Sequence, residues 1–199
     1  MAISNELVKK LRAETGVGIL DCKRALEQSD GDLQKAKLLL REWGKELFAK
    51  GAATLEGRVE SYIHHNGKVG VLVEVNCQTD FVANSAEFRE LIKNVAMHIA
   101  AADPAPLYIK PEDVPKEVLE QEKEVYRKRY AQEGKPPHII EKIIEGRIKQ
   151  FYEQVCLLKQ PYVKDPALKT RVEDLLADLA AKLNENIVIK RFARFEVGR

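Results

Sequence analysis

The sequence predicts an α+β fold in which a small three-helix bundle precedes a core module with a three-stranded antiparallel sheet, packed by helices and a helical hairpin. Three observations support this prediction. Glycine turns divide the first 44 residues into three helical segments, two runs rich in Val, Ile and Tyr flank Asn66-Gly67, and a third alternating run ends the sequence. Helical patterns occupy the chain between the second and third of these runs. The order strand, strand, helices, strand is typical of an α+β domain.

The length and charge of the chain limit the classes of protein to which it can belong. Its 199 residues suit one domain or two small ones, and a composition of 45% hydrophobic and 32% charged residues excludes the disordered and fibrous classes. Lys and Arg number 33 against 31 Asp and Glu, a net charge of +2. This balance is unlike that of a dedicated nucleic-acid binder. We therefore expect a protein partner and no direct nucleic-acid binding.

The cysteines and the chain start indicate the compartment. Cys22, Cys77 and Cys156 lie far apart, with no CxxC pair and no metal-ligand spacing, and their odd number suggests a reducing environment. The first residues lack the pattern of a signal peptide, and no apolar run approaches the roughly 18 residues of a membrane span. We expect a cytoplasmic protein with no membrane association, no metal and no cofactor.

Residues 1–44 are predicted to form the helical bundle. Its apolar stripes at helical spacing are Ile3, Leu7, Val8 and Leu11; Cys22, Ala25 and Leu26; and Leu33, Ala36, Leu39, Leu40 and Trp43. A unit of this size is near the lower limit for independent folding. Packing inside the bundle is expected to bury Ile19 and Leu20, at the start of the second helix, only in part. This apolar pair is therefore a candidate contact with a partner.

The next segment leads into a β-hairpin. Residues 45–56 have weaker periodicity and are predicted to be a linker, partly helical, with the domain boundary near Glu56 and a core domain over residues 57–199. Strands are predicted over residues 57–64 and 68–77, because Asn66-Gly67 is the preferred sequence of a type I′ hairpin turn. The second strand alternates valine with other residues, so one face of the sheet needs a covering helix.

Helices follow until the last strand. Asn84 and Glu87 form a candidate capping box for the covering helix, which is predicted to end at Asp103-Pro104. The remaining predicted elements are a helical hairpin over residues 116–132 and 137–158, a helix over residues 166–183 and a strand over residues 187–197.

Short motifs of enzymes are weak in this chain. Gly16-Val17-Gly18 follows a helix and lacks a third glycine and a Lys-Ser/Thr sequel, so a helix stop explains it better than a phosphate loop. His64-His65 lie beside the hairpin turn without metal-ligand spacing and are interpreted as surface residues. No activated nucleophile or acid–base pair can be named, which makes an unrecognised enzyme the weakest alternative.

Two surface features are candidates for binding. A basic cluster surrounds the glycine turn, and the acidic residues beside it favour a mixed-charge protein interface over a phosphate-tracking groove, the simplest alternative being a solvated helix face. In residues 76–84, Phe81 and Val82 permit two interpretations. They either form a hydrophobic staple against the next helix, or they project with Asp80 as a rigid contact of the hot-spot type.

Three stretches together carry a resemblance to a known family. Residues 11–26 (LRAETGVGILDCKRAL), 73–82 (VEVNCQTDFV) and 185–192 (ENIVIKRF) resemble the elongation factor Ts family. The resemblance implies a guanine-nucleotide exchange factor for elongation factor Tu, without covalent chemistry, built from a ubiquitin-associated-like bundle and an α/β core. A binding protein for RNA or the ribosome, using the basic bundle and residues 190–194, is the alternative.

The resemblance also implies which residues contact the partner. In the bundle, the residues implied to dock on the GTPase domain are Lys9, Arg12, Ile19, Leu20 and Lys23. In the core, the residues implied to disturb the partner's Mg²⁺ and phosphate site are Thr79, Asp80, Phe81 and Val82. A methionine pair common in the family is replaced here by Ile19 and Leu20, which keeps the contact apolar.

The length of the chain indicates its assembly. Longer members of the family carry two core modules, whereas this chain has length for one, and the resemblance implies that such short members pair as homodimers. The basic linker of the family is altered here in residues 47–51, where Lys50 is the remaining candidate contact.

Overall fold

A computed structural model describes residues 3–49 and 53–198, and for residues 47–49 the backbone alone. Contacts within the chain define two compact units. The first comprises Met1–Met97 with Glu173–Arg199, and the second comprises His98–Val172. The predicted division into a bundle (1–44), a linker (45–56) and a core (57–199) remains a prediction, and Lys50 of that linker lies outside the described residues.

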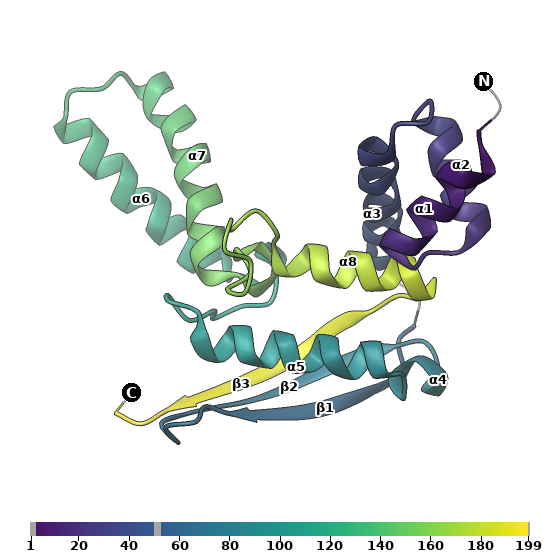
Figure 1. The fold of residues 1–199 in the computed structure, drawn as a ribbon. Coiled ribbons are helices and arrows are strands. Elements are labelled where there is room, and N and C mark those ends of the chain that lie inside the picture. Colours follow the sequence, from purple (N-terminus) through teal and green to yellow (C-terminus); the bar gives the residue numbers. More distant parts are fainter. Residues whose placement is uncertain (1–2, 50–52, 199) are drawn as a thin grey trace. The chain divides into compact units, whose positions relative to one another are not determined.

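The first unit begins with the three predicted helices, α1 (Asn5–Thr15), α2 (Ile19–Gln28) and α3 (Leu33–Ala49) (Figure 1). Ser4 caps α1 by accepting a hydrogen bond from the Leu7 N–H at 3.3 Å. Gly16 ends α1 in the left-handed conformation (φ 72°), which glycine adopts at little steric cost. The bundle core contains Val8, Leu11, Val17, Cys22, Ala25, Leu26, Ala36 and Leu40. Helix α3 extends to Ala49, so the first residues of the predicted linker are helical.

The sheet has three antiparallel strands, β1 (Glu56–Ile63), β2 (Val69–Cys77) and β3 (Val188–Glu196), with β2 in the centre. In the hairpin, Ile63 pairs with Gly70, and the His64 N–H donates to the Val69 carbonyl. The predicted type I′ turn is wrong, because Gly67 has a positive φ (69°) but Asn66 does not, and the Gly67 N–H donates to the His64 carbonyl at 2.7 Å. Strand β3 pairs with β2 across more than a hundred residues of chain, with an irregularity at Glu74/Val75. The predicted α+β class and three-stranded sheet are confirmed.

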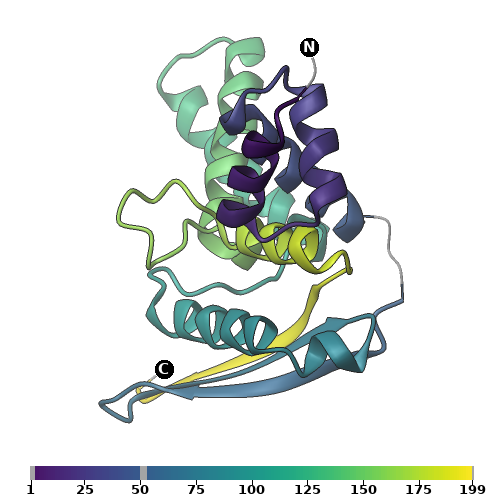
Figure 2. The same ribbon diagram turned by 45° about the vertical axis from the view of Figure 1, so that its right-hand side comes forward.

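The two faces of the sheet differ in burial. Val71, Val73 and Val75 are buried, and helix α5 (Ala86–Ala101) lies along the sheet in both ribbon views (Figures 1 and 2). Phe88 and Ile92 of α5 are buried as well. The opposite face carries exposed apolar side chains, namely Val59, Ile63, Leu72 and Phe195.

A one-turn helix, α4 (Asp80–Ala83), connects β2 to α5. The predicted Asn84–Glu87 capping box is wrong. Ser85 Oγ accepts the Phe88 N–H at 3.2 Å and so caps α5, while it donates to the Val82 carbonyl at 2.8 Å. Asn84 instead closes α4, because its side-chain amide and its backbone N–H both donate to the Asp80 carbonyl.

The second unit contains the helical hairpin, α6 (Lys116–Gln132) and α7 (Pro137–Val155), with the 3₁₀ turns η1 (Pro111–Asp113) and η2 (Leu157–Lys159). Tyr130 and the isoleucines 140, 144 and 148 form the core between α6 and α7. Helix α6 has the predicted bounds, whereas α7 ends three residues earlier than predicted, at Val155.

Helix α8 (Val172–Leu183) starts six residues later than predicted. The preceding loop is held by Asp165, whose carboxylate accepts the N–H groups of Ala167, Lys169 and Thr170. These hydrogen bonds, that of Thr170 foremost, lower the pKa of Asp165 to about 2. Leu168 also has a positive φ (51°), which interrupts any helix through this segment.

Candidate functional site

The 78–82 loop, defined as Gln78 to Val82, comes directly after the central strand β2. Thr79 is the N-cap of α4, because its Oγ1 accepts the Val82 N–H at 3.3 Å. Val82 is only 3% exposed, and Ala83 is buried as well. Asp80 is exposed, and Phe81 is 80% exposed. The four predicted contact residues thus divide into an outward pair, Asp80 and Phe81, and the residues that hold it.

Phe81 does not pack as a hydrophobic staple, since most of its ring surface is open to water. Of the two interpretations that the sequence left open, the structure therefore favours the projection. Val82 packs inward and serves the role of an anchor.

Glu185 is a residue of this region that the sequence analysis did not single out. Its Oε2 accepts the backbone N–H groups of Gln78 (3.2 Å) and Thr79 (3.1 Å), and its Oε1 accepts the Thr79 hydroxyl at 2.6 Å. Burial, and then the charge of Glu185, raise the pKa of the nearby Cys77 thiol to about 11. The signal in the sequence was slight: an acidic residue two positions before the predicted last strand (187–197), inside the third stretch of the family resemblance.

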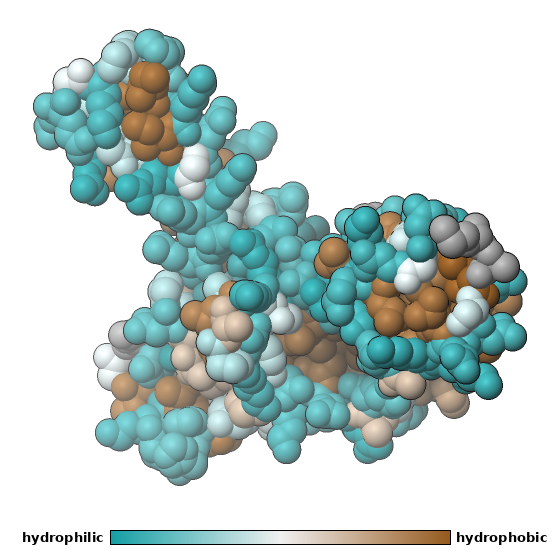
Figure 3. Space-filling model, turned by 45° about the horizontal axis from the view of Figure 1, so that its top comes forward, coloured by the Kyte–Doolittle hydropathy of each residue, from teal (hydrophilic) through white to brown (hydrophobic). Residues whose placement is uncertain are grey.

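The second group of predicted contact residues lies on the bundle. Ile19 and Leu20 start α2 and are 49% and 78% exposed, while the neighbouring Val17 is buried and anchors the turn before them. Lys9, Arg12 and Lys23 are also exposed. The bundle surface shows apolar side chains surrounded by hydrophilic ones (Figure 3). This combination suits a protein interface with a polar rim.

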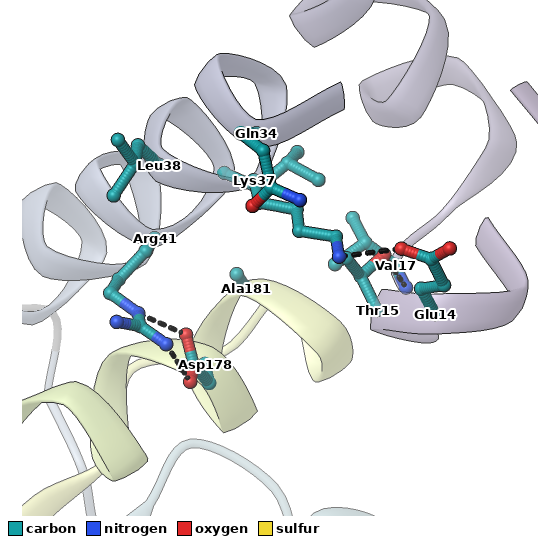
Figure 4. A pocket seen from close by; sticks show the side chains of 10 residues that line it. Glu14, Thr15, Val17, Gln34, Lys37, Leu38, Arg41, Asp178 and Ala181 are labelled. Carbon is teal, nitrogen blue, oxygen red and sulfur yellow. Dashed lines mark hydrogen bonds and ion pairs between the residues drawn. The ribbon is translucent and has the colours of Figure 1, made fainter. Parts of the chain in front are cut away.

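A hollow of about 420 Å³ is lined by residues of α3 and α8, by the end of α1 and by Val17 of the bundle turn (Figure 4). Its charged groups pair with one another: Lys37 with Glu14, and Arg41 with Asp178 through two hydrogen bonds of 2.7 Å. The hydrogen bond from Lys37 lowers the pKa of Glu14. Because the charged groups that line the hollow already pair with one another, we interpret the hollow as part of the region where α3 packs on α8.

The end of α8 contacts both candidate surfaces of the first unit. A Cβ on Gly16, in the turn before α2, would lie 2.8 Å from Cε of Lys182. Two residues beyond the helix, Glu185 binds the 78–82 loop. The C-terminal end of α8 and the two residues after it thus connect the bundle turn with the 78–82 loop.

Residues 190–194, the basic segment that the alternative RNA-binding function would use, have part of their positive charge neutralised by ion pairs. Arg191 pairs with Glu74 at 2.6 Å, and Arg194 pairs with Glu196 at 2.7 Å. Such pairing leaves less positive charge for phosphate groups. The strand therefore offers weak support for an RNA-binding surface.

Within residues 3–49 and 53–198, no three His, Cys, Asp or Glu side chains are grouped so that they could hold a metal ion. In the same ranges, none of the helices has the length and apolar character needed to span a bilayer. The three cysteines are buried thiols, and His98 is a buried histidine bonded to Gln160.

Comparison with known proteins gives consistent similarities. The family model for elongation factor Ts matches residues 40–199. The elongation factor Ts of Caldanaerobacter subterraneus subsp. tengcongensis is 54% identical over 198 residues, 98% of this chain and 97% of that protein. The elongation factor Ts of Coprothermobacter proteolyticus is 52% identical over 200 residues and the full length of both chains, and that of Thermotoga neapolitana is 50% identical over 100% of this chain and 98% of its own.

Proposed function

Because the chain belongs to the elongation factor Ts family, we propose that it is a guanine-nucleotide exchange factor that binds elongation factor Tu and promotes GDP release. The observation that supports this most directly is the exposed Phe81 beside Asp80 on a short, well-anchored turn. Exchange of this kind uses no covalent step and no cofactor of the factor itself.

The energetics of exchange set a requirement for the interface. A GTPase of this type holds its nucleotide through loop amides, a lysine and Mg²⁺. The factor must bind the nucleotide-free partner more tightly than the GDP-bound partner, and by linkage GDP weakens binding of the factor equally. Loosening GDP a thousandfold requires about 4 kcal/mol of differential binding.

Phe81 alone meets this requirement only if it is buried fully. Burying a phenylalanine removes roughly 150 to 250 Å² from water, or about 4 to 6 kcal/mol before ordering losses. We therefore propose that the work is shared. Asp80 and Phe81 disturb the metal and phosphate site, Thr79 caps the turn, and Val82 anchors it from inside the sheet domain.

In this proposal the bundle supplies affinity for the GTPase domain. Its apolar contact is the pair Ile19 and Leu20, and its basic contacts are Lys9, Arg12 and Lys23. Their separation in sequence from the loop allows binding and nucleotide release to be tested independently.

We also propose that two copies of the chain pair through the outer face of the sheet. This face carries exposed apolar residues from all three strands, namely Val59, Ile63, Leu72 and Phe195. Several exposed apolar residues on one face are typical of an interaction site. A homodimer would present two bundles and two loops, and so accommodate two partner molecules.

The test is release of fluorescent GDP from purified elongation factor Tu, with the protein at substoichiometric amounts and over a range of Mg²⁺ concentrations. We expect each molecule to accelerate release from many partner molecules, most strongly where Mg²⁺ is limiting. No acceleration, with an active partner and a folded protein, would contradict the proposal.

A further inference from the structure

Glu185 occupies a position that the fold defines closely. Asn184 follows α8 with a positive φ (53°), and the Glu185 N–H donates to the Ala180 carbonyl at 3.3 Å, five residues back. This is the pattern of a Schellman helix end, which fixes the direction of the chain after the helix. Strand β3 begins at Val188, so the backbone that carries the Glu185 carboxylate is held from both sides.

The contact between Glu185 and the loop is reciprocal. The Glu185 carboxylate accepts three hydrogen bonds from Gln78 and Thr79. In return, the Gln78 side-chain oxygen accepts the Asn186 N–H at 2.8 Å. Hydrogen bonds to an ionised carboxylate are stronger than neutral ones. The base of the loop is therefore tied to the segment between α8 and β3 in both directions.

The Thr79 hydroxyl links this contact to α4. It donates its proton to Glu185 Oε1 and accepts the Val82 N–H with a lone pair. With the proton directed to the carboxylate, the oxygen lone pairs point toward the first turn of α4. Glu185 thus orients the cap as well as the backbone that precedes it.

The loop needs such support because it contains little secondary structure of its own. Helix α4 has four residues, far below the length at which a helix persists without tertiary contacts. Phe81, its largest side chain, is exposed and contributes little to packing. The orientation of Asp80 and Phe81 therefore depends on Val82 and Ala83 inside, and on Glu185 at the base.

We propose that Glu185 is a positioning residue for nucleotide exchange: it holds Gln78 and Thr79 so that Asp80 and Phe81 meet the partner in a fixed orientation. The inference rests on the proposed exchange function. A loop ordered before binding avoids the entropy loss of ordering it during binding. Without Glu185, the partner would still dock on the bundle, but the loop would reach its working conformation less often.

The first part of the test uses the protein without its partner. Solvent exchange of the Gln78 and Thr79 amide hydrogens is followed by NMR in the unaltered protein, Glu185→Ala and Glu185→Gln. A matched control is Glu87→Gln, which removes a nearby carboxylate that pairs with Lys182 and not with the loop. We expect exchange of both amides to be at least about tenfold faster in Glu185→Ala and unchanged in the control.

The second part measures release of GDP from elongation factor Tu. We expect Glu185→Ala to lower the maximal release rate about tenfold, with less than about a twofold change in the concentration for half-maximal release, because the bundle is intact. Glu185→Gln retains an oxygen that accepts the two N–H groups, so it should recover much of the rate. It also keeps the side-chain volume, which leaves a foldable variant if Glu185→Ala does not fold.

The outcomes separate this inference from the function on which it rests. Unchanged amide exchange in both Glu185 variants would overturn the positioning role, as would faster amide exchange with a normal release rate. A change only in the half-maximal concentration would overturn it too. If the unaltered protein releases no GDP, the proposed function fails and the role in exchange fails with it, while the amide data still report whether Glu185 orders the loop.

Discussion

Phe81 leaves 80% of its surface in water, while the next residue, Val82, leaves 3%. The reason is geometric, because consecutive side chains on a helical turn point about 100° apart. Val82 is buried, and this orientation turns Phe81 outward. A single turn therefore separates a residue that stabilises the fold from one that is available to a partner.

We expect alanine substitutions of Phe81 and Val82 to have opposite effects. Phe81→Ala should leave the free energy of unfolding within about 0.5 kcal/mol and lower the maximal GDP release rate at least about tenfold. Val82→Ala should lower the free energy of unfolding by about 1 to 3 kcal/mol, because it removes buried apolar surface. Urea unfolding and GDP release are measured on both variants. Parallel losses of stability and release in Phe81→Ala would indicate a packing role instead.

Leu20 tests the contribution of the bundle. Leu20→Asp places a charge on an exposed apolar contact and should raise the concentration for half-maximal GDP release about tenfold, with the maximal rate kept. Leu38→Asp, at another exposed leucine of the bundle, is the matched control. An equal effect of both substitutions, or no effect of Leu20→Asp, would remove Leu20 from the predicted contact.

His98 makes the stability of the second unit depend on pH. Its side chain is buried, Nε2 lies 3.0 Å from Gln160 Oε1, and Nδ1 accepts the Val163 N–H at 3.3 Å. Burial lowers the pKa of His98 below its ordinary value of 6.5, although the Gln160 hydrogen bond opposes this. The folded chain therefore binds the proton less readily than the unfolded chain.

The sign follows from linkage. Above about pH 6.5, His98 is neutral in both the folded and the unfolded chain, and its contribution to stability is complete. As the pH falls from there toward the folded-state pKa, the free energy of unfolding decreases by up to about 1.4 kcal/mol per pH unit. Urea unfolding between pH 8 and pH 5 measures this. In His98→Gln the slope below pH 6.5 should be smaller, and an identical slope in both proteins would assign the acid sensitivity to other groups.

At the scale of elements, the bundle packs on the core domain through α3 and α8 of the first unit. Gly44 allows their close approach, since a Cβ there would lie 2.1 Å from the Ala177 carbonyl oxygen. Arg41 and Lys45 pair with Asp178 and Asp174 on either side of this contact. The glycine is explained by this helix crossing, which the sequence pattern of α3 alone did not indicate.

Two helical glycines therefore predict opposite effects of the same substitution. Gly44→Ala should destabilise the protein by about 1 to 3 kcal/mol, because backbone atoms of α8 obstruct the new methyl group. Gly146→Ala in α7 meets nothing within 4 Å and should stabilise its helix by about 0.5 to 1 kcal/mol. Unfolding midpoints in urea compare them. A stabilising Gly44→Ala would show that α3 and α8 do not approach this closely.

In the molecule as a whole, α5 covers one face of the sheet (Figure 2), and the other face carries the exposed apolar residues Val59, Ile63, Leu72 and Phe195. Residues of all three strands contribute to the exposed surface. Because β3 is far from the hairpin strands in the sequence, no short stretch of sequence contains the whole surface. Its hydrophobic character is the physical basis of the proposed homodimer.

Phe195→Asp tests this assembly. A charge on the exposed face should shift the protein from dimer to monomer in sedimentation velocity, since an unpaired buried charge is strongly unfavourable at an interface. Val125→Asp, at an exposed valine of α6, is the control and should leave the dimer intact. A monomeric unaltered protein would refute the proposed pairing, as would a dimer that is insensitive to Phe195→Asp.

Local patterns in the sequence predicted most elements of this fold. The hairpin around Asn66-Gly67 and the bounds of α6 agree with the structure, because a turn signal or an amphipathic stripe is complete within about ten residues. The start of α8 was predicted too early because Asp165 holds the preceding loop by hydrogen bonds, and at α5 the cap is Ser85 where Asn84 had been predicted. The candidate loop was found by its composition and by family resemblance.

The class of fold, the order of most elements and the family follow from patterns in the amino-acid sequence. The outward orientation of Phe81, the contact of Glu185 with the loop and the close approach of Gly44 to α8 become visible only in the folded protein. The physical reason is distance along the chain: Thr79 and Glu185 are 106 residues apart, and Arg41 and Asp178 are 137 apart. Periodicity describes the face of one element, whereas these contacts exist only once two elements have packed together.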